Sequence, residues 1–331
     1  MPEIGYMLSS EDHPPGDLVS FAVAAEDSGL DHAVISDHFH PWTRTQGNSP
    51  FVWSVLGGIA ARTSRLVVGT AVTCPTMRTH PAVIAHAAAT TADLFDGRFF
   101  LGVGTGENLN EHILGDRWPP TDVRLEMLEE AVAVMRLLWQ GGQQSHRGRH
   151  YTVENAELFN LPDGPLPVYV SAFGPKAVEV AARIGDGLVG TAPEADLVDR
   201  FVSGAGGSAP AVATAKCCWG PDEGEARQRV ADRWPNVGLP GELGQELPTP
   251  AHFEQAGQLV SADSIPDAIP CGPDPQPYVD SIRAYADAGY RRVYFHDVGA
   301  DQHGFVRFLA EDVVPRLAAG EARGVSGALG G

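Results

Sequence analysis

HAVISDHFHPW, residues 32–42, is the stretch on which the fold prediction rests. Its first four residues form a short, mainly apolar run, which predicts a buried strand. A carboxylate, two imidazoles and an indole follow within seven residues, and Pro41 ends regular strand pairing. Reactive side chains at the carboxyl end of a strand are typical of α/β barrels. The alternative is a solvated loop in which Asp37 accepts backbone N–H bonds.

Outward from this stretch, strand-like runs alternate with helical patterns along the whole chain. We expect strands at 4–7, 32–36, 66–70, 99–103, 168–171, 187–190, 211–219 and 292–297. We expect helices at 15–29, 51–63, 81–95, 123–139, 175–184, 223–234, 251–259, 276–288 and 304–317. Eight strand–helix repeats predict a (β/α)8 TIM barrel with insertions. An open doubly wound sheet is the alternative, but MLSS at 7–10 lacks a dinucleotide glycine fingerprint.

The chain is expected to form a single barrel domain over residues 1–331, because no linker or repeat divides it. The segments 141–167 and 235–273 are rich in turn residues and read as insertions, the first with a hairpin at 150–153. The Gly-rich segment 319–331 reads as a flexible tail.

Composition excludes several classes of partner. The 42 acidic and 23 basic residues give a net charge of −19, which would repel nucleic acid. No apolar stretch of about 18 residues could span a membrane, and no signal-peptide pattern is visible. The four cysteines lack metal-ligand spacing, so no metal is expected. A reducing, cytoplasmic location follows.

Titratable and small residues gather at the predicted strand ends. His38 and Glu107 follow different strands yet would face one barrel mouth, where Glu11 follows the first strand. Gly174-Pro175-Lys176 would begin a helix whose free N–H groups, with the lysine, favour an anion such as a cofactor phosphate. Simpler interpretations are a solvated carboxylate at Glu107 and an ordinary helix start at Pro175.

Four segments resemble one known family in order along the chain: SDHFHPW (36–42), GVGTGENLNEH (102–112), VYVSAFGPK (168–176) and FHDVGADQ (295–302). They resemble the deazaflavin branch of the luciferase-like superfamily, and more narrowly the branch named after F420-dependent glucose-6-phosphate dehydrogenase. The resemblance implies a (β/α)8 barrel, the hydride carrier coenzyme F420 and a homodimer.

The resemblance also implies roles for the residues near the two most specific segments. Asp37 would contact the deazaflavin, and His38 would be the general base on a substrate hydroxyl. Trp42 would form a wall of the site and stabilise the reacting substrate. Glu107 would assist charge and proton handling beside the ring, and Asn110 would hydrogen-bond the coenzyme.

Further coenzyme contacts are implied after the third and fifth strands. Ala71-Val72 falls where the family has a non-prolyl cis peptide behind the ring. Ala71 replaces a family serine and Cys74 a threonine, so the contacts expected there are those of the backbone. The phosphate-bearing tail would lie along Ser171, Ala172, Gly174 and Lys176.

The residues suit alcohol oxidation on their own terms. A neutral imidazole titrates near the working pH and suits removal of a hydroxyl proton while hydride leaves the same carbon. Asp37 would hold its tautomer or support the imidazolium, unless the two side chains face apart as strand neighbours do. The leading hypothesis is an F420-dependent oxidoreductase acting on a sugar or alcohol carbon. The alternatives are a monooxygenase using flavin mononucleotide (FMN) and a non-catalytic carrier, which would need no acid/base pair.

The substrate prediction concerns a phosphate pocket that the resemblance implies. Thr191 matches the family, but Glu194 and Asp267 stand where lysines are expected, and only Arg291 remains as a candidate cation. Like charges about 4 Å apart repel by about 4 kcal/mol at an effective dielectric near 20. A small molecule without phosphate is therefore expected, in contact with Glu11, Trp42, Thr191, Glu194 and Arg291. A glucose-6-phosphate or other sugar-phosphate dehydrogenase is the alternative.

Overall fold

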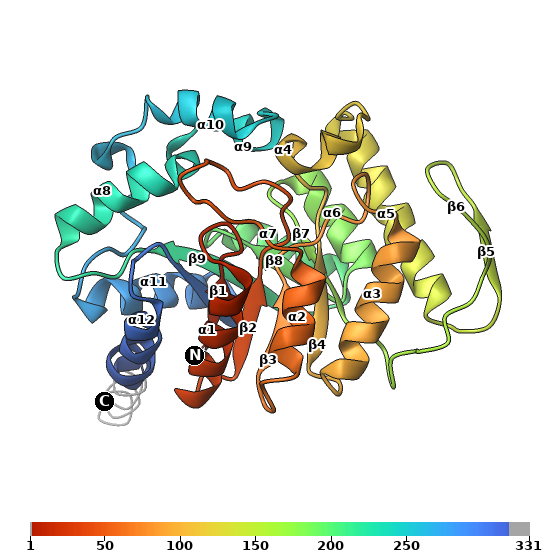
Figure 1. Cartoon of the computed structure of the whole chain (residues 1–331), viewed down its shortest axis with the longest axis horizontal. Coiled ribbons are helices and arrows are strands. Elements are labelled where there is room, and N and C mark those ends of the chain that lie inside the picture. The colour runs from red at the N-terminus through yellow and green to blue at the C-terminus, as the bar shows by residue number, and fades with distance from the viewer. Residues whose placement is uncertain (1, 318–331) are drawn as a thin grey trace, which may run out of the picture.

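The computed structural model describes residues 2–317 and confirms the (β/α)8 barrel (Figure 1). The barrel strands are β1 (Glu3–Leu8), β2 (His32–Ile35), β3 (Val67–Thr70), β4 (Phe99–Val103), β7 (Val168–Ser171), β8 (Gly187–Gly190), β9 (Ala211–Cys217) and β10 (Arg292–Asp297). They close in the order β1-β10-β9-β8-β7-β4-β3-β2, and every neighbouring pair is parallel. All eight carboxyl ends therefore meet at one end of the barrel.

The register between neighbouring strands brings predicted site residues to the same end of the barrel. Leu8 of β1 pairs with Ile35 of β2. Glu11 and His38 each lie three positions beyond this pair, at the same height above the barrel. Ile35 also pairs with Thr70 of β3, so Ala71 begins the next loop beside them.

Helices surround the barrel and cover its strands. The outer helices are α1 (Pro15–Asp27), α2 (Val52–Ala60), α3 (Pro81–Leu94), α5 (Thr121–Leu138), α6 (Pro175–Ile184), α7 (Ala195–Gly204), α11 (Pro275–Asp287) and α12 (Gln302–Phe308), with a π-helical continuation at Leu309–Val313. The sequence predicts no helix between the sixth and seventh strands, and this is wrong. Helix α7 buries Leu197, Val198 and Phe201 there, an apolar stripe too short to stand out in the sequence.

Side chains fill the barrel interior. One buried cluster is formed by Met7, Val34, Phe100, Val189, Val212 and Tyr294. Glycine at position 69 makes room for the ring of Phe100, because a Cβ there would lie 2.1 Å from its Cζ atom. The interior is thus a packed core below the open mouth.

The two insertions differ in place and content. The first holds the hairpin β5 (Gln144–Arg147) and β6 (Thr152–Ala156), which stands apart from the barrel in Figure 1. The hairpin expected at 150–153 is present but extends over residues 144–156, with residues 148–151 connecting its two strands. The second follows α8 (Glu223–Arg233) and holds η2 (Pro235–Gly238), α9 (Leu243–Glu246), α10 (Pro250–Gly257) and η3 (Ala262–Ser264).

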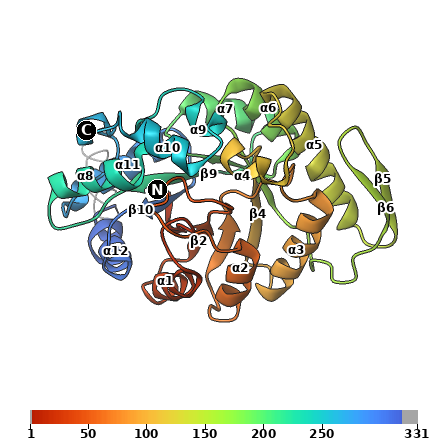
Figure 2. The same cartoon turned by 45° about the horizontal axis from the view of Figure 1, so that its top comes forward.

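The second insertion lies over the strand carboxyl ends, beside the short helix α4 (Asn108–Glu111) (Figure 2). The side-chain nitrogen of Asn108 donates to the carbonyl oxygen of Glu246 at 2.9 Å. The tail expected at 319–331 lies outside the described residues. Across residues 2–317, no helix is long and apolar enough to cross a membrane.

Candidate active site

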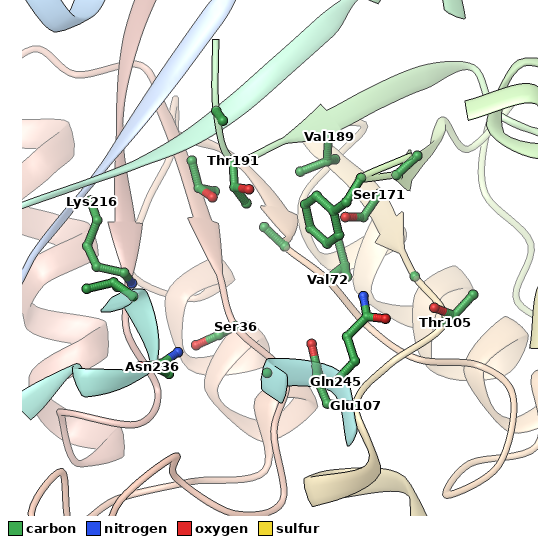
Figure 3. A pocket seen from close by; sticks show the side chains of 18 of the residues that line it. Ser36, Val72, Thr105, Glu107, Ser171, Val189, Thr191, Lys216, Asn236 and Gln245 are labelled. Atoms are coloured by element: carbon green, nitrogen blue, oxygen red, sulfur yellow. The ribbon is translucent and has the colours of Figure 1, made fainter. Parts of the chain in front are cut away.

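The carboxyl ends of the barrel strands surround a cavity of about 930 Å³ (Figure 3). This volume is near the upper end of the range for small-molecule sites. Each strand contributes to its lining, through Glu11, His38, Ala71, Glu107, Ser171, Thr191, Lys216 and His296. The second insertion adds Asn236 and Gln245. The cavity is therefore shared between the barrel and the insertion above it.

His38 lies between two carboxylates. Its Nδ1 is 2.7 Å from Oε1 of Glu11, and its Nε2 is 3.7 Å from Oε2 of Glu107. Glu11 is fixed from behind, because Ser36 Oγ and Ser9 Oγ donate to its Oε2 at 2.7 Å and 3.0 Å. Glu11 thus orients the imidazole, while Glu107 faces its second nitrogen.

These contacts change the protonation of His38. Burial alone lowers the pKa of His38, but the negative charges of Glu11, Glu107 and Asp37 raise it to about 9. Burial raises the pKa of Glu11, but the charge and hydrogen bonding of His38 lower it to about 2. The sequence predicts a neutral imidazole at working pH. The structure instead favours the imidazolium there, because the buried carboxylate of Glu11 lies 2.7 Å from the ring and raises its pKa.

Asp37 makes its contacts away from His38. Its Oδ2 accepts from Thr73 Oγ1 at 2.9 Å, and its Oδ1 accepts from Arg78 Nη2 at 3.1 Å. Glu111 accepts from the backbone N–H of Arg78 at 3.1 Å. Burial raises the pKa of Glu111 to about 7, although Arg78 opposes this. The expectation that Asp37 holds the tautomer of His38 is wrong, because Glu11 occupies that position. Asp37 adds only its more distant charge.

Trp42 forms a wall beside the imidazole. Its ring centroid is 5.3 Å from that of His38, with the planes at 74°. On the other side of Trp42 lies the buried ring of Phe253, with the two ring centroids 5.1 Å apart and the ring planes at 84°. Phe253 belongs to α10, so the second insertion supports an aromatic wall of the site.

The loop after β3 gives the cavity a flat apolar face. The Ala71–Val72 peptide is cis, as the resemblance implies, and both residues line the cavity. Glycine at position 104 allows β4 to lie against this face, because a Cβ there would be 2.8 Å from Val72 Cγ2. Cys74 is buried beside it, with its Sγ 3.0 Å from Thr76 Oγ1.

The end of β7 and the start of α6 form another side of the cavity. Ser171, Ala172, Gly174 and Lys176 all line it. Gly174 precedes α6 without a side-chain cap, and a Cβ there would meet nothing within 4 Å. The first N–H groups of the helix are thus open to an anion. Lys176 is exposed, and its Nζ lies 2.9 Å from Oδ1 of Asp122.

Asn110 lies behind the cavity wall and does not line it. Its Oδ1 accepts from the backbone N–H groups of Phe39 and His40 at 3.0 Å and 2.9 Å. Its buried Nδ2 has no hydrogen-bond partner among the described residues. Asn110 therefore positions the loop after β2, and its contact with a coenzyme stays a prediction.

Known proteins share this fold and sequence. The family described as luciferase-like monooxygenase matches residues 1–292. The F420-dependent glucose-6-phosphate dehydrogenase of Microbacterium testaceum is 35% identical over 325 residues, covering 95% of this chain and 96% of that protein. This chain belongs to the luciferase-like family. The F420-dependent glucose-6-phosphate dehydrogenase of Segniliparus rotundus is 36% identical over 329 residues, covering 95% of this chain and 98% of that protein.

A solved structure is also similar to this chain. It is an F420-dependent secondary alcohol dehydrogenase in complex with an F420-acetone adduct. It superimposes with a TM-score of 0.88 at 28% identity, covering 96% of this chain and 99% of that one.

Two of the predicted substrate residues, Arg291 and Glu194, lie outside the cavity, and so does Asp267. Arg291 precedes β10 and lines a separate hollow with Glu3 and Tyr290, at the amino ends of the strands. Its assignment to the substrate is wrong, because residues before a parallel strand face the opposite end of the barrel. Glu194 precedes α7 and is exposed, and Asp267 is fully exposed and pairs with Arg227 at 3.2 Å. Neither lines the cavity, whereas Thr191 does.

The sequence did not predict four polar residues that line the cavity near β9, β10 and the second insertion. Lys216 and His296 line it from β9 and β10, and Asn236 and Gln245 line it from the insertion. Lys216 carried a usable signal, because it is a lone charge within the apolar strand AVATAKC. The insertion residues carried none, since no periodicity placed them over the mouth.

No group of three or more histidine, cysteine or acidic residues could hold a metal ion within residues 2–317.

Proposed function

We propose that this F420-dependent oxidoreductase transfers a hydride between the deazaflavin and a sugar or alcohol carbon of a substrate without phosphate. The observation that carries the proposal is the position of the partly buried His38 imidazole, 2.7 Å from Glu11 and 3.7 Å from Glu107. A group of this kind can exchange a proton with a substrate oxygen, which hydride transfer at an alcohol carbon requires. The printed names of the relatives and of the structural neighbour support the coenzyme and the reaction class.

The residues present fit a deazaflavin coenzyme. The flat face at Ala71 and Val72 suits a planar ring, and the open backbone at Gly174 with the start of α6 suits its phosphate. Ser171 and Ala172 lie between these two places on the cavity wall. When bound, F420 supplies the hydride acceptor or donor, while the protein supplies position and electrostatics.

His38 determines where the proton goes. Its Nδ1 is occupied by Glu11, so Nε2, on the side of Glu107, is the nitrogen that can face a substrate oxygen. At neutral pH this nitrogen carries a proton, which suits donation to the oxygen of a carbonyl that is being reduced. Alcohol oxidation needs the neutral base, which prevails only above the pKa of about 9. The free enzyme at neutral pH is thus ready for reduction.

The charges around the cavity disfavour a phosphate dianion. Among the described lining residues, five are carboxylic: Glu11, Asp37, Glu107, Glu111 and Glu242. The lining cations besides His38 are Lys176 and Lys216, and no arginine joins them within residues 2–317. Arginine is the side chain best matched to phosphate. The substrate prediction therefore stands on this charge balance, and not on Glu194 or Asp267.

Coenzyme titration and a substrate panel test the proposal. F420 is expected to bind and to be reduced or reoxidised with secondary alcohols, ketones or free sugars, whereas FMN is not expected to bind. Binding of FMN with oxygen-dependent turnover would instead identify a monooxygenase. Efficient turnover of glucose 6-phosphate, with glucose inactive, would identify a sugar-phosphate dehydrogenase.

We also infer a homodimer and a cytoplasmic location. Phe39, Phe51 and Val83 are exposed apolar side chains on neighbouring elements, and a second copy would cover such a surface. The four cysteines are free and buried, as suits a reducing compartment. Light scattering of the purified protein tests the dimer, because a monomeric mass would contradict it.

A further inference from the structure

Lys216 places an ammonium group on the side of the cavity away from the apolar face. It is partly buried near the end of β9 and lines the cavity. Its Nζ lies 3.1 Å from Nδ1 of His296 and 3.7 Å from the ring centroid of Trp234. Figure 3 shows Lys216 and Asn236 on one side of the cavity, with Val72, Ser171 and Thr105 on the other.

His296 uses only one donor of this ammonium group. Burial, and then the charge of Lys216, lower the pKa of His296 to about 4, so its neutral Nδ1 accepts from Nζ. An ammonium group has three donors, and Trp234 offers a ring face instead of an acceptor. At least one donor is therefore left for a group inside the cavity.

Lys216 also lacks a contacting counter-charge, unlike the partly buried arginines Arg78 and Arg233. Arg78 is 3.1 Å from Asp37, and Arg233 is 2.8 Å from Asp12. Over residues 2–317, no carboxylate lies within 4 Å of Lys216. Burial lowers the pKa of Lys216 to about 8, although Glu11 and Asp12 oppose this. Even a partly buried cation without a paired anion is costly, and an anionic ligand would complete the pair.

We propose that Lys216 binds a carboxylate of the substrate, so that the enzyme selects hydroxy acids, oxo acids or sugar acids over neutral alcohols. This inference rests on the proposed function and names its substrate class. A single cation matches a single negative charge, while the charges of Glu11 and Asp12 act against a second one. The buried Oδ1 of Asn236 has no hydrogen-bond partner among the described residues, so it can accept from a hydroxyl of the same substrate.

Two matched series of ligands test the inference by equilibrium binding to the F420-loaded enzyme. The first compares glucose, glucuronate and glucose 6-phosphate, which differ only in the group at one end of the same sugar. The second compares 2-butanol with 3-hydroxybutyrate. The carboxylate is expected to bind about ten- to a hundredfold more tightly than its neutral partner in at least one series.

Two substitutions assign this preference to Lys216. Lys216→Met keeps the length of the side chain without its charge and is expected to abolish the preference, while binding of the neutral partner changes less than about threefold. Lys216→Arg keeps the charge and is expected to retain part of the preference. F420 affinity and thermal unfolding are measured for both variants, and no loss is expected, because the methionine removes an unpaired buried charge.

The outcomes separate this inference from the proposed function. Equal binding of carboxylate and neutral ligands in both series overturns the inference, even if neutral alcohols are oxidised. Tightest binding of glucose 6-phosphate, lost in Lys216→Met, also overturns it. A carboxylate preference that depends on Lys216 supports it, and holds even if no ligand exchanges hydride with F420, a result that contradicts the proposed function alone.

Discussion

The two halves of the cavity differ in whether their charged side chains form ion pairs. On the side of β1 to β4, His38 contacts Glu11 and Arg78 contacts Asp37, so the ion pairs are complete before any ligand binds. On the side of β8 to β10, the ammonium of Lys216 contacts a neutral imidazole and an indole ring. A completed pair holds a reactive group in position, whereas an incomplete one leaves interaction free energy for a ligand. We therefore assign proton transfer to the first half and substrate recognition to the second.

Replacing the central group of the first half is expected to have the largest effect. His38→Ala removes the proton donor and acceptor, so turnover is expected to fall by about two to four powers of ten. F420 affinity is expected to stay near that of the wild type, since His38 faces the substrate side. Steady-state kinetics and coenzyme fluorescence measure the two quantities. Unchanged turnover would remove His38 from the mechanism.

The carboxylate behind His38 tests whether the ion pair itself matters. Glu11→Gln keeps the shape but leaves His38 without its contacting charge, so the pKa of His38 is expected to fall. Breaking a buried pair in this way costs about 3–5 kcal/mol in unfolding free energy. Denaturant unfolding measures that cost, and the pH profile of turnover measures the shift. A profile identical to that of the wild type would show that Glu11 does not set the pKa.

The same pair predicts how stability depends on pH. The raised pKa of His38 contributes stability that is present below about 6.5 and is lost as the pH rises through about 9. The depressed pKa of Glu11 contributes stability that is present above about 4.5 and is lost as the pH falls through about 2. In Glu11→Gln both dependences are expected to weaken.

Glu107→Gln tests the second carboxylate and is expected to have a smaller effect. The distance of 3.7 Å to His38 and the partial exposure of Glu107 both weaken its influence. We expect turnover to fall by about tenfold with little change in F420 affinity. Loss of affinity with unchanged turnover at saturation would show that Glu107 only holds the coenzyme.

Arg291→Ala tests a residue at the opposite end of the barrel from the cavity and is expected to have the smallest effect. Arg291 lies at the amino ends of the strands, so kcat/KM is expected to stay unchanged and stability to change by about 0.5 kcal/mol or less. A specific loss of activity on a phosphate ester would return Arg291 to the substrate site.

The sequence predicted the first half of the cavity better than the second, for a physical reason. His38, Ala71 and Glu107 lie within four residues of the ends of short apolar strands, so strand register largely fixes their height above the barrel. Glu194 and Asp267 lie in a helix cap and an insertion, where no pairing rule determines which side chain faces the mouth.

The protonation of His38 could not be predicted from the sequence. It depends on Glu11, 27 positions away in the chain, which only the adjacent pairing of β1 and β2 brings to 2.7 Å. Lys216 was visible in its strand, but its missing counter-charge appears only when the neighbouring side chains are placed.

The pH dependence of kcat/KM for reduction of a ketone by reduced F420 tests the central claim most directly, because it reports the protonation of the free enzyme. The imidazolium between Glu11 and Glu107 predicts a constant value at neutral pH and a decline of about tenfold per pH unit above about 9, a decline that Glu11→Gln moves to lower pH. A decline centred near the ordinary imidazole value of about 6.5, or no decline up to about pH 10, would contradict the assignment of His38 as the proton donor.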